Sequence, residues 1–171
     1  LDADLFFTHT HMDHIQGLPF FAPLYNPKNN VHLHAGHLEP PHDLHSVIDT
    51  MLMKDPVFPV PSSLIEQACT FNDYQCGKVF DLGDGIVIRT GKLNHPNGAC
   101  GYRIEFADKA IAICTDTEHF DDGIDQSVVS LAQDADAMVY DSAYTAEEYS
   151  KFKGWGHSTW QEAIKVAETA N

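Results

Sequence analysis

Histidine and aspartate side chains gather near the start of the chain, directly after the apolar run at residues 3–7. The segment Thr8-His9-Thr10-His11-Met12-Asp13-His14 carries four metal-binding side chains: His9, His11, Asp13 and His14. His9 and His11 alternate, so they point to the same side of an extended strand. A turn at Met12 brings Asp13 and His14 to a second point nearby. Imidazoles and a carboxylate bind borderline divalent ions such as zinc, so the two ligand pairs predict two adjacent ions.

Three more candidate residues lie in later loops. His95 follows the segment 92–94 and is followed at once by a turn at Pro96. Asp116 ends a strongly apolar strand expected at 110–114, where a carboxylate can lie in a cleft and bridge two cations. His157 lies in the loop just before the last predicted helix. Each of these would be an ordinary loop residue if taken alone, but together with the first motif they form a set.

Composition predicts one globular domain over residues 1–171. The chain has 171 residues, 43% of them hydrophobic, which is enough to bury a sizeable core. A formal charge of −15 with scattered basic residues argues against an extended nucleic-acid surface. No apolar stretch is long enough to span a membrane. The four cysteines lack C-x-x-C spacing, which is typical of reduced thiols in a cytoplasmic protein.

The predicted elements change along the chain from short strands and loops to an α/β pattern. The expected strands are 3–8, 31–34, 85–90, a hairpin of 102–106 with 110–114, and 137–140; the expected helices are 43–53, 122–133, one from Thr145 and one after Ser158. For the last helix we expect a capping box, Ser158 with Gln161 or Thr159 with Glu162, and an apolar face of Ala163, Ile164, Ala167 and Ala170.

With these motifs together, the sequence resembles the metallo-β-lactamase superfamily, whose first motif is H-x-H-x-D-H. The resemblance implies an α/β fold in the form of a four-layer αββα sandwich, with the metals at one edge of two sheets. It also implies the ligand sets: His9, His11 and His95 for one ion, Asp13 and His14 for the other, and Asp116 as the bridge. Zinc is the first expectation, with manganese and iron as alternatives, because His and Asp suit all three.

Within the superfamily, the sequence is most similar to the phosphodiesterase branch, which holds tRNA 3′-end-processing endonucleases and carbon–phosphorus lyase accessory enzymes. The similar segments are His14–Phe21, Thr115–His119 and Gly156–Thr159. In that branch the last motif supplies a proton donor, here His157, rather than a ligand. The implied activity is metal-dependent hydrolysis of a small or cyclic phosphodiester by a hydroxide that bridges two cations about 3.5–4 Å apart, with Asp13 also orienting this nucleophile. For Asp141, support of a ligand histidine and a plain turn role remain equally open.

The chain departs from the family pattern at both ends. The superfamily usually has β-strands before the first motif, and the branch usually has a last histidine ligand on a strand after the final helix. We therefore expect a fragment that lacks its N-terminal strands, with a seventh ligand beyond Asn171.

Two other function classes stay open. One is a thioester or lactone hydrolase of the same fold, and the other is a non-catalytic metal-binding sensor domain. The tRNA-processing group carries a substrate-binding arm between its third and fourth motifs, whereas little more than a hairpin separates His95 from Asp116 here. A small-molecule phosphodiester is therefore the expected partner, with no membrane association.

Overall fold

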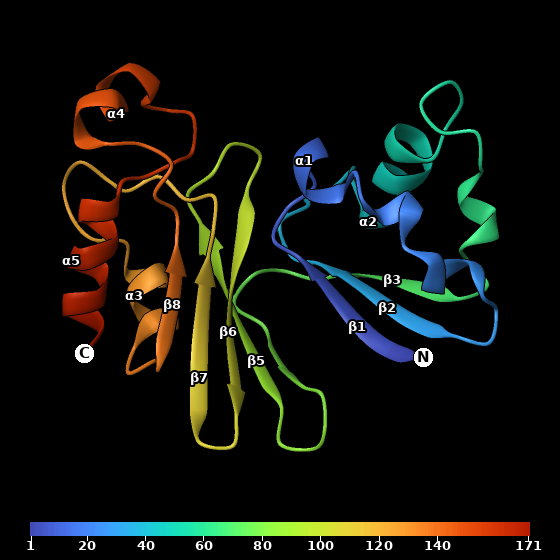
Figure 1. The fold of residues 1–171 in the computed structure, drawn as a ribbon, viewed down its shortest axis with the longest axis horizontal. Coiled ribbons are helices and arrows are strands. Elements are labelled where there is room, and N and C mark those ends of the chain that lie inside the picture. The colour runs from blue at the N-terminus through green and yellow to red at the C-terminus, as the bar shows by residue number, and fades with distance from the viewer. The chain divides into compact units, whose positions relative to one another are not determined.

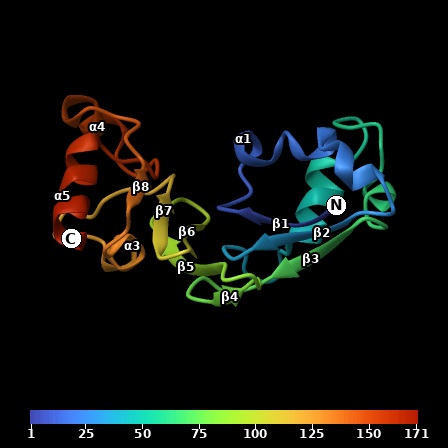
Figure 2. The same ribbon diagram turned by 60° about the horizontal axis from the view of Figure 1, so that its bottom comes forward.

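The structure is a computed structural model that describes residues 1–171 and contains two compact units, Leu1–Gln75 and Cys76–Asn171. The first unit holds a three-stranded parallel sheet in the order β1 (Asp2–Phe7), β2 (Asn30–Ala35) and β3 (Cys69–Asp73). Both ribbon views place the helices α1 (Met12–Ile15) and α2 (Leu44–Val47) on the same side of this sheet (Figures 1 and 2).

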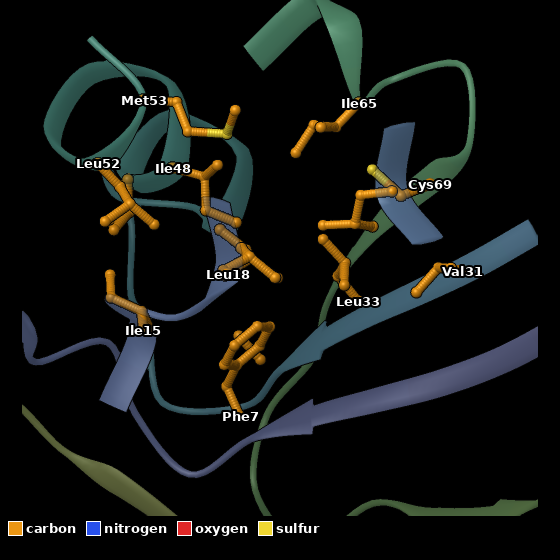
Figure 3. Close-up of a cluster of buried hydrophobic side chains, with 14 residues drawn as sticks. Phe7, Ile15, Leu18, Val31, Leu33, Ile48, Leu52, Met53, Ile65 and Cys69 are labelled. Atoms are coloured by element: carbon orange, nitrogen blue, oxygen red, sulfur yellow. The ribbon is translucent and has the colours of Figure 1, made fainter. Parts of the chain in front are cut away.

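Alternating residues of these strands form the core of the first unit. Leu5 of β1 is in register with Leu33 of β2, and Leu33 is in register with Phe71 of β3. Because side chains alternate across a strand, these three share one face of the sheet. Figure 3 shows Leu33 and Phe7 pointing toward Ile48 and Leu18 from the segments above the sheet. The alternating apolar residues of β1 and β2 therefore pack into this core, and they hold the start of the loop after β1 in place.

Leu33→Ala is expected to lower the free energy of unfolding of the chain by about 2–5 kcal/mol, because the fully buried side chain leaves a cavity in this core. Urea denaturation followed by circular dichroism measures the change. Leu64→Ala is the matched control, since Leu64 is 53% exposed in the same unit and its loss should change stability by no more than about 0.5 kcal/mol. Equal losses in both variants would contradict the assignment of Leu33 to the core.

Shorter helices connect the strands of the first unit. The helix expected at 43–53 is confirmed as α2 followed by a π-helical turn, η3 (Ile48–Leu52), with Asp43 as the N-cap in a capping box with Ser46. The remaining connections are the 3₁₀ turns η1 (Leu18–Phe20), η2 (Ala22–Tyr25) and η4 (Ser62–Leu64). The strand β3 was not predicted.

The second unit is built on a five-stranded sheet. Its order is β4 (Val79–Asp81), β5 (Val87–Leu93), β6 (Ala99–Phe106), β7 (Lys109–Cys114) and β8 (Ala137–Tyr140). All neighbours are antiparallel except β7 and β8, which are parallel. The helices α3 (Gln126–Ala132) and α5 (Trp160–Ala170) cover one face of this sheet, and α4 (Ala146–Phe152) lies beyond the end of β8 (Figure 1).

Two glycines allow α3 to approach the sheet closely. Gly91 of β5 is in register with Gly101 of β6. A Cβ at Gly91 would lie 2.9 Å from Ser127 Oγ, and one at Gly101 would lie 2.8 Å from Leu131 Cδ1. The pair of glycines thus explains how the α3 side chains reach the strand that leads to His95.

Most elements predicted in the second unit are confirmed, but the details of α5 were wrong. Thr159 is the N-cap of α5, yet its side chain does not cap the helix, and Ser158 Oγ is hydrogen-bonded to His119 Nδ1 at 2.8 Å. Ile164, expected on the apolar face, is 47% exposed, and Val166 is buried in its place. The three-residue strand β4 was also not predicted.

The α/β class is confirmed by two sheets flanked by helices. The four-layer sandwich and the single domain over residues 1–171 stay predictions. Cys69 and Cys114 are buried free thiols. None of the helices has the length and apolar composition that crossing a membrane requires.

Candidate metal centre

The first ligand cluster lies in the loop after β1 and in the helix α1 that follows it. His11 is the N-cap of α1, so the chain leaves the strand and turns into the helix within this motif. The His9 ring centroid lies 4.5 Å from that of His11 and 4.1 Å from that of His14. Asp13 Oδ2 lies 3.5 Å from His14 Nε2, and the Asp13 side chain is 75% exposed. Within the first unit, the structure therefore brings the three predicted histidines together and places Asp13 beside them.

His37 supports this loop and was missed by the sequence analysis. It follows the end of β2, the parallel neighbour of β1, and its Nε2 is hydrogen-bonded to Thr10 Oγ1 at 3.0 Å. Burial, and to a smaller extent the charge of His11, lowers the pKa of His37 to about 4. His37 is therefore neutral at neutral pH. The signal for it was its place after β2, because the carboxyl ends of parallel strands meet at one edge of a sheet.

His95 follows β5 in the second unit, and a backbone carbonyl orients its ring. Its Nδ1–H donates to the carbonyl of Gly156 at 2.8 Å. The lone pair of the neutral ring is then on Nε2, and a metal-ligating histidine usually donates its other ring N–H to a carbonyl or carboxylate in this way. His95 thus has the tautomer of an Nε2 ligand.

Asp116 and His157 come together with Asp141 in the second unit. One potential ligand atom from each of the three residues lies within 4.8 Å of the others. His157 Nδ1 is 3.8 Å from Asp116 Oδ1 and 2.7 Å from Asp141 Oδ2. Asp116 lies two residues beyond the end of β7 and has a positive φ of 54°. An imidazole paired to a buried carboxylate beside a second carboxylate can bind a cation or hold a proton.

Asp141 resolves an alternative that the sequence left open. Its Oδ1 accepts the N–H of Ala143 at 3.0 Å, as a turn residue would, while Oδ2 accepts the N–H of Thr117 at 3.1 Å. The same Oδ2 accepts the Nδ1–H of His157. Asp141 therefore acts both as a turn residue and as the hydrogen-bond partner of a histidine. That histidine is the predicted proton donor and not one of the predicted metal ligands. Its signal in the sequence was its position directly after the strand β8, next to β7.

The structure describes the predicted residues as two groups, one in each unit. His9, His11, Asp13 and His14 lie in the first unit, and His95, Asp116 and His157 lie in the second. The joint ligand set remains a prediction.

Comparison with known proteins identifies the family. A family model described as a beta-lactamase superfamily domain matches residues 2–171. The chain belongs to the beta-lactamase superfamily. The family predicted from the H-x-H-x-D-H segment of this superfamily member is therefore confirmed.

Among curated proteins, this superfamily chain is similar to the ribonuclease Z of Lactiplantibacillus plantarum, with 24% identity over 210 residues that cover 98% of this chain and 66% of the relative. Among solved structures, it is similar to the metallo-beta-lactamase fold protein YhfI from Bacillus subtilis, with a TM-score of 0.71, 19% identity, and coverage of 99% of this chain and 61% of that one. The short form of human tRNase Z gives a TM-score of 0.66, 18% identity, and coverage of 98% and 68%. The two structural likenesses show the fold, and the chain spans just under two thirds of the curated relative.

Gly156→Ala is expected to weaken zinc binding by about 10–100-fold, because it disturbs the carbonyl that orients His95. Gly156 has a φ of 83°, and a Cβ there would lie 2.3 Å from His95 Nδ1. Zinc affinity can be measured by competition with a chromogenic chelator. Gly83→Ala is the matched control, since Gly83 has a φ of 82° and no atom within 4 Å of its Cβ position. Zinc affinities that fall equally in both variants would show that backbone strain alone is responsible.

Proposed function

We propose that this chain is a metal-dependent hydrolase that cleaves small or cyclic phosphodiesters. The observation that carries the proposal is the pair of His157 and Asp141, held at 2.7 Å beside the carboxylate of Asp116. An imidazole oriented in this way can give a proton to a leaving group, which is worth about 10²–10⁴-fold in rate.

The proposed metal ligands come from the family motif and from the local geometry of each group. We assign His9, His11 and His95 to one divalent ion, Asp13 and His14 to a second, and Asp116 as the bridge between them. The converging imidazoles of the first unit and the Nδ1–H tautomer of His95 both fit this role. Zinc suits this mixture of imidazole and carboxylate, with manganese or iron as alternatives.

When bound, two divalent ions supply charge neutralisation for a phosphodiester and lower the pKa of a bound water to near neutrality. The side chains of this protein supply the proton and orient the nucleophile. Asp141 keeps the Nδ1–H of His157 directed at its own carboxylate, so the proton to be transferred is on Nε2 when the ring is cationic. Asp13 orients the nucleophile as well as binding an ion.

The leaving group distinguishes the phosphodiesterase from the thioester hydrolase of the same fold. A thiolate is a weak base, since a free thiol has a pKa of about 8.5, and it departs without a proton. An alkoxide is about as basic as the hydroxide of water, whose pKa is about 15.7, so it needs a general acid. The paired His157 therefore favours an ester with an alkoxide leaving group. The ribonuclease Z and tRNase Z relatives are named for phosphodiester cleavage in RNA.

A small substrate suits this chain better than a long polyanion. Its formal charge is −15 with only 10 lysines and arginines, so an extended nucleic-acid strand would meet repulsion outside the metal site. We place the activity in the cytoplasm, where thiols such as those of Cys69 and Cys114 would stay reduced.

The test is hydrolysis of bis(p-nitrophenyl) phosphate by the zinc-loaded chain, followed by release of p-nitrophenolate, with Asp13→Ala as the control. Turnover that disappears in Asp13→Ala would support the proposal. Turnover of a thioester such as S-lactoylglutathione without any phosphodiester cleavage would replace it by the thioester hydrolase. Zinc bound without turnover of either substrate would instead favour the sensor domain.

A further inference from the structure

Glu118 is a buried carboxylate that neither ligand group uses. It is 7% exposed and lies in the loop after β7, two residues beyond Asp116. Its Oε1 accepts the N–H of Gly154 at 2.8 Å and the hydroxyl of Tyr149 at 2.8 Å. Its Oε2 accepts the N–H of Gly156 at 2.8 Å and shares that of Gly154 at 3.0 Å. Burial raises the pKa of Glu118, but these donors outweigh it and hold the pKa below its usual value.

The segment 154–156 owes its conformation to this carboxylate. Gly154 and Gly156 both have positive φ values, of 88° and 83°, and their N–H groups converge on Glu118. Convergent backbone N–H groups form a concave site for an anion. A buried carboxylate is stable only when such donors satisfy it. The carboxylate therefore holds the loop in its conformation, and the loop N–H groups stabilise the buried charge.

The same loop carries the contacts of two residues of the proposed site. The carbonyl of Gly156 accepts the Nδ1–H of His95, and His157 is the next residue in the chain. Asn94, the neighbour of His95, is also hydrogen-bonded to Glu118. Its carbonyl accepts the N–H of Glu118 at 2.8 Å, and its Nδ2 donates to the carbonyl of Glu118 at 2.9 Å. A closed ring of hydrogen bonds thus runs from Asn94 through Glu118 and Gly156 to His95.

We propose that Glu118 is a positioning residue that sets the ring orientation and tautomer of His95 and, through the same loop, the place of His157. One carboxylate thereby aligns a ligand and the proton donor of the proposed hydrolase together. The inference rests on the proposed function for the roles of these two histidines. The alignment itself is a property of the second unit and can be measured without turnover.

Glu118→Gln tests the proposal with little change in size. The amide can accept at one oxygen only, and its NH₂ group would face one of the two loop N–H groups. We expect the Nδ1–H tautomer of His95 in the metal-free chain to give way to a mixture, seen in long-range ¹⁵N–¹H correlation spectra of ¹⁵N-histidine-labelled protein. Zinc affinity from chelator competition should fall by about 10–100-fold.

Glu148→Gln is the matched control. Glu148 caps α4 by accepting from the N–H of Thr145, and it has no hydrogen bond to the loop 154–156. It should leave the His95 tautomer and the zinc affinity unchanged. A Glu118→Gln protein with the wild-type tautomer and zinc affinity would overturn the proposal. These two readouts decide it even if the chain hydrolyses no phosphodiester, so its failure and the failure of the proposed function are distinguishable.

Amide hydrogen exchange of the wild-type chain gives a second test that needs no variant. The N–H groups of Gly154 and Gly156 should exchange far more slowly than that of Gly85, a positive-φ glycine in an exposed turn. Exchange of all three at the same unprotected rate would contradict the role of Glu118 independently of how well Glu118→Gln folds.

Discussion

Asp116→Asn should lose zinc and phosphodiester turnover together. The substitution removes the negative charge expected to bridge two cations, while asparagine tolerates the positive φ of 54° at this position. The loss of zinc affinity should exceed the about 10–100-fold typical of removing a supporting partner of a ligand. Metal content by atomic emission and hydrolysis of bis(p-nitrophenyl) phosphate measure the two effects.

Asp84 offers a matched control for Asp116. It is an exposed aspartate of the same unit with a nearly equal φ of 51°, in the turn after β4. Asp84→Asn should keep full zinc content and turnover. An Asp116→Asn protein that retains two zinc ions and wild-type turnover would show that the bridging assignment is wrong.

His157→Ala should cut turnover by about 10²–10⁴-fold while zinc content stays at the wild-type level. The size of the loss should depend on the leaving group. An alkoxide needs the proton that His157 would give, whereas p-nitrophenolate is a much weaker base and departs without it. The full loss is therefore expected with a cyclic phosphodiester such as a 2′,3′-cyclic nucleotide, and a smaller one with bis(p-nitrophenyl) phosphate.

Asp141→Asn separates the two roles open to His157. The Nδ1–H of His157 would lose its carboxylate acceptor, so the ring would be held less firmly in place and turnover of the cyclic substrate should fall with zinc retained. Zinc lost from His157→Ala would instead make His157 a ligand. Equal losses on both substrates would exclude a general acid role.

The first ligand cluster was predictable because it is local. His9, His11 and His14 lie within six residues, directly after an apolar strand, and a strand followed by a turn brings them together without help from distant parts of the chain. The strands β1, β2 and β8 were predictable for a similar reason, since their patterns are set by residues next to one another. The short strand β4 lacks such a pattern, because three residues hold no full period of alternation.

The cap of α5 shows how tertiary contacts override a local motif. Ser158 and Thr159 have the residue types of a capping box, but the Ser158 hydroxyl is hydrogen-bonded to His119, which is 39 residues away in the chain. The N-cap position falls on Thr159, whose side chain makes no cap hydrogen bond, and the Ser158 hydroxyl contacts His119 and not the helix end. By contrast, Thr145 and Glu148 form a capping box at α4, where no distant partner competes.

The sequence by itself determined the family, the α/β class and the types of the candidate ligands, because these depend on side-chain chemistry and short-range spacing. Only the tertiary structure decided which groups support them. Asp141 meets His157 because the segment after β8 runs beside the segment before α5, where the N–H of Tyr144 donates to the carbonyl of Ser158. The role of Glu118 depends on backbone N–H groups of two glycines. Every residue except proline has such an N–H, so only the fold determines which of them converge on one carboxylate.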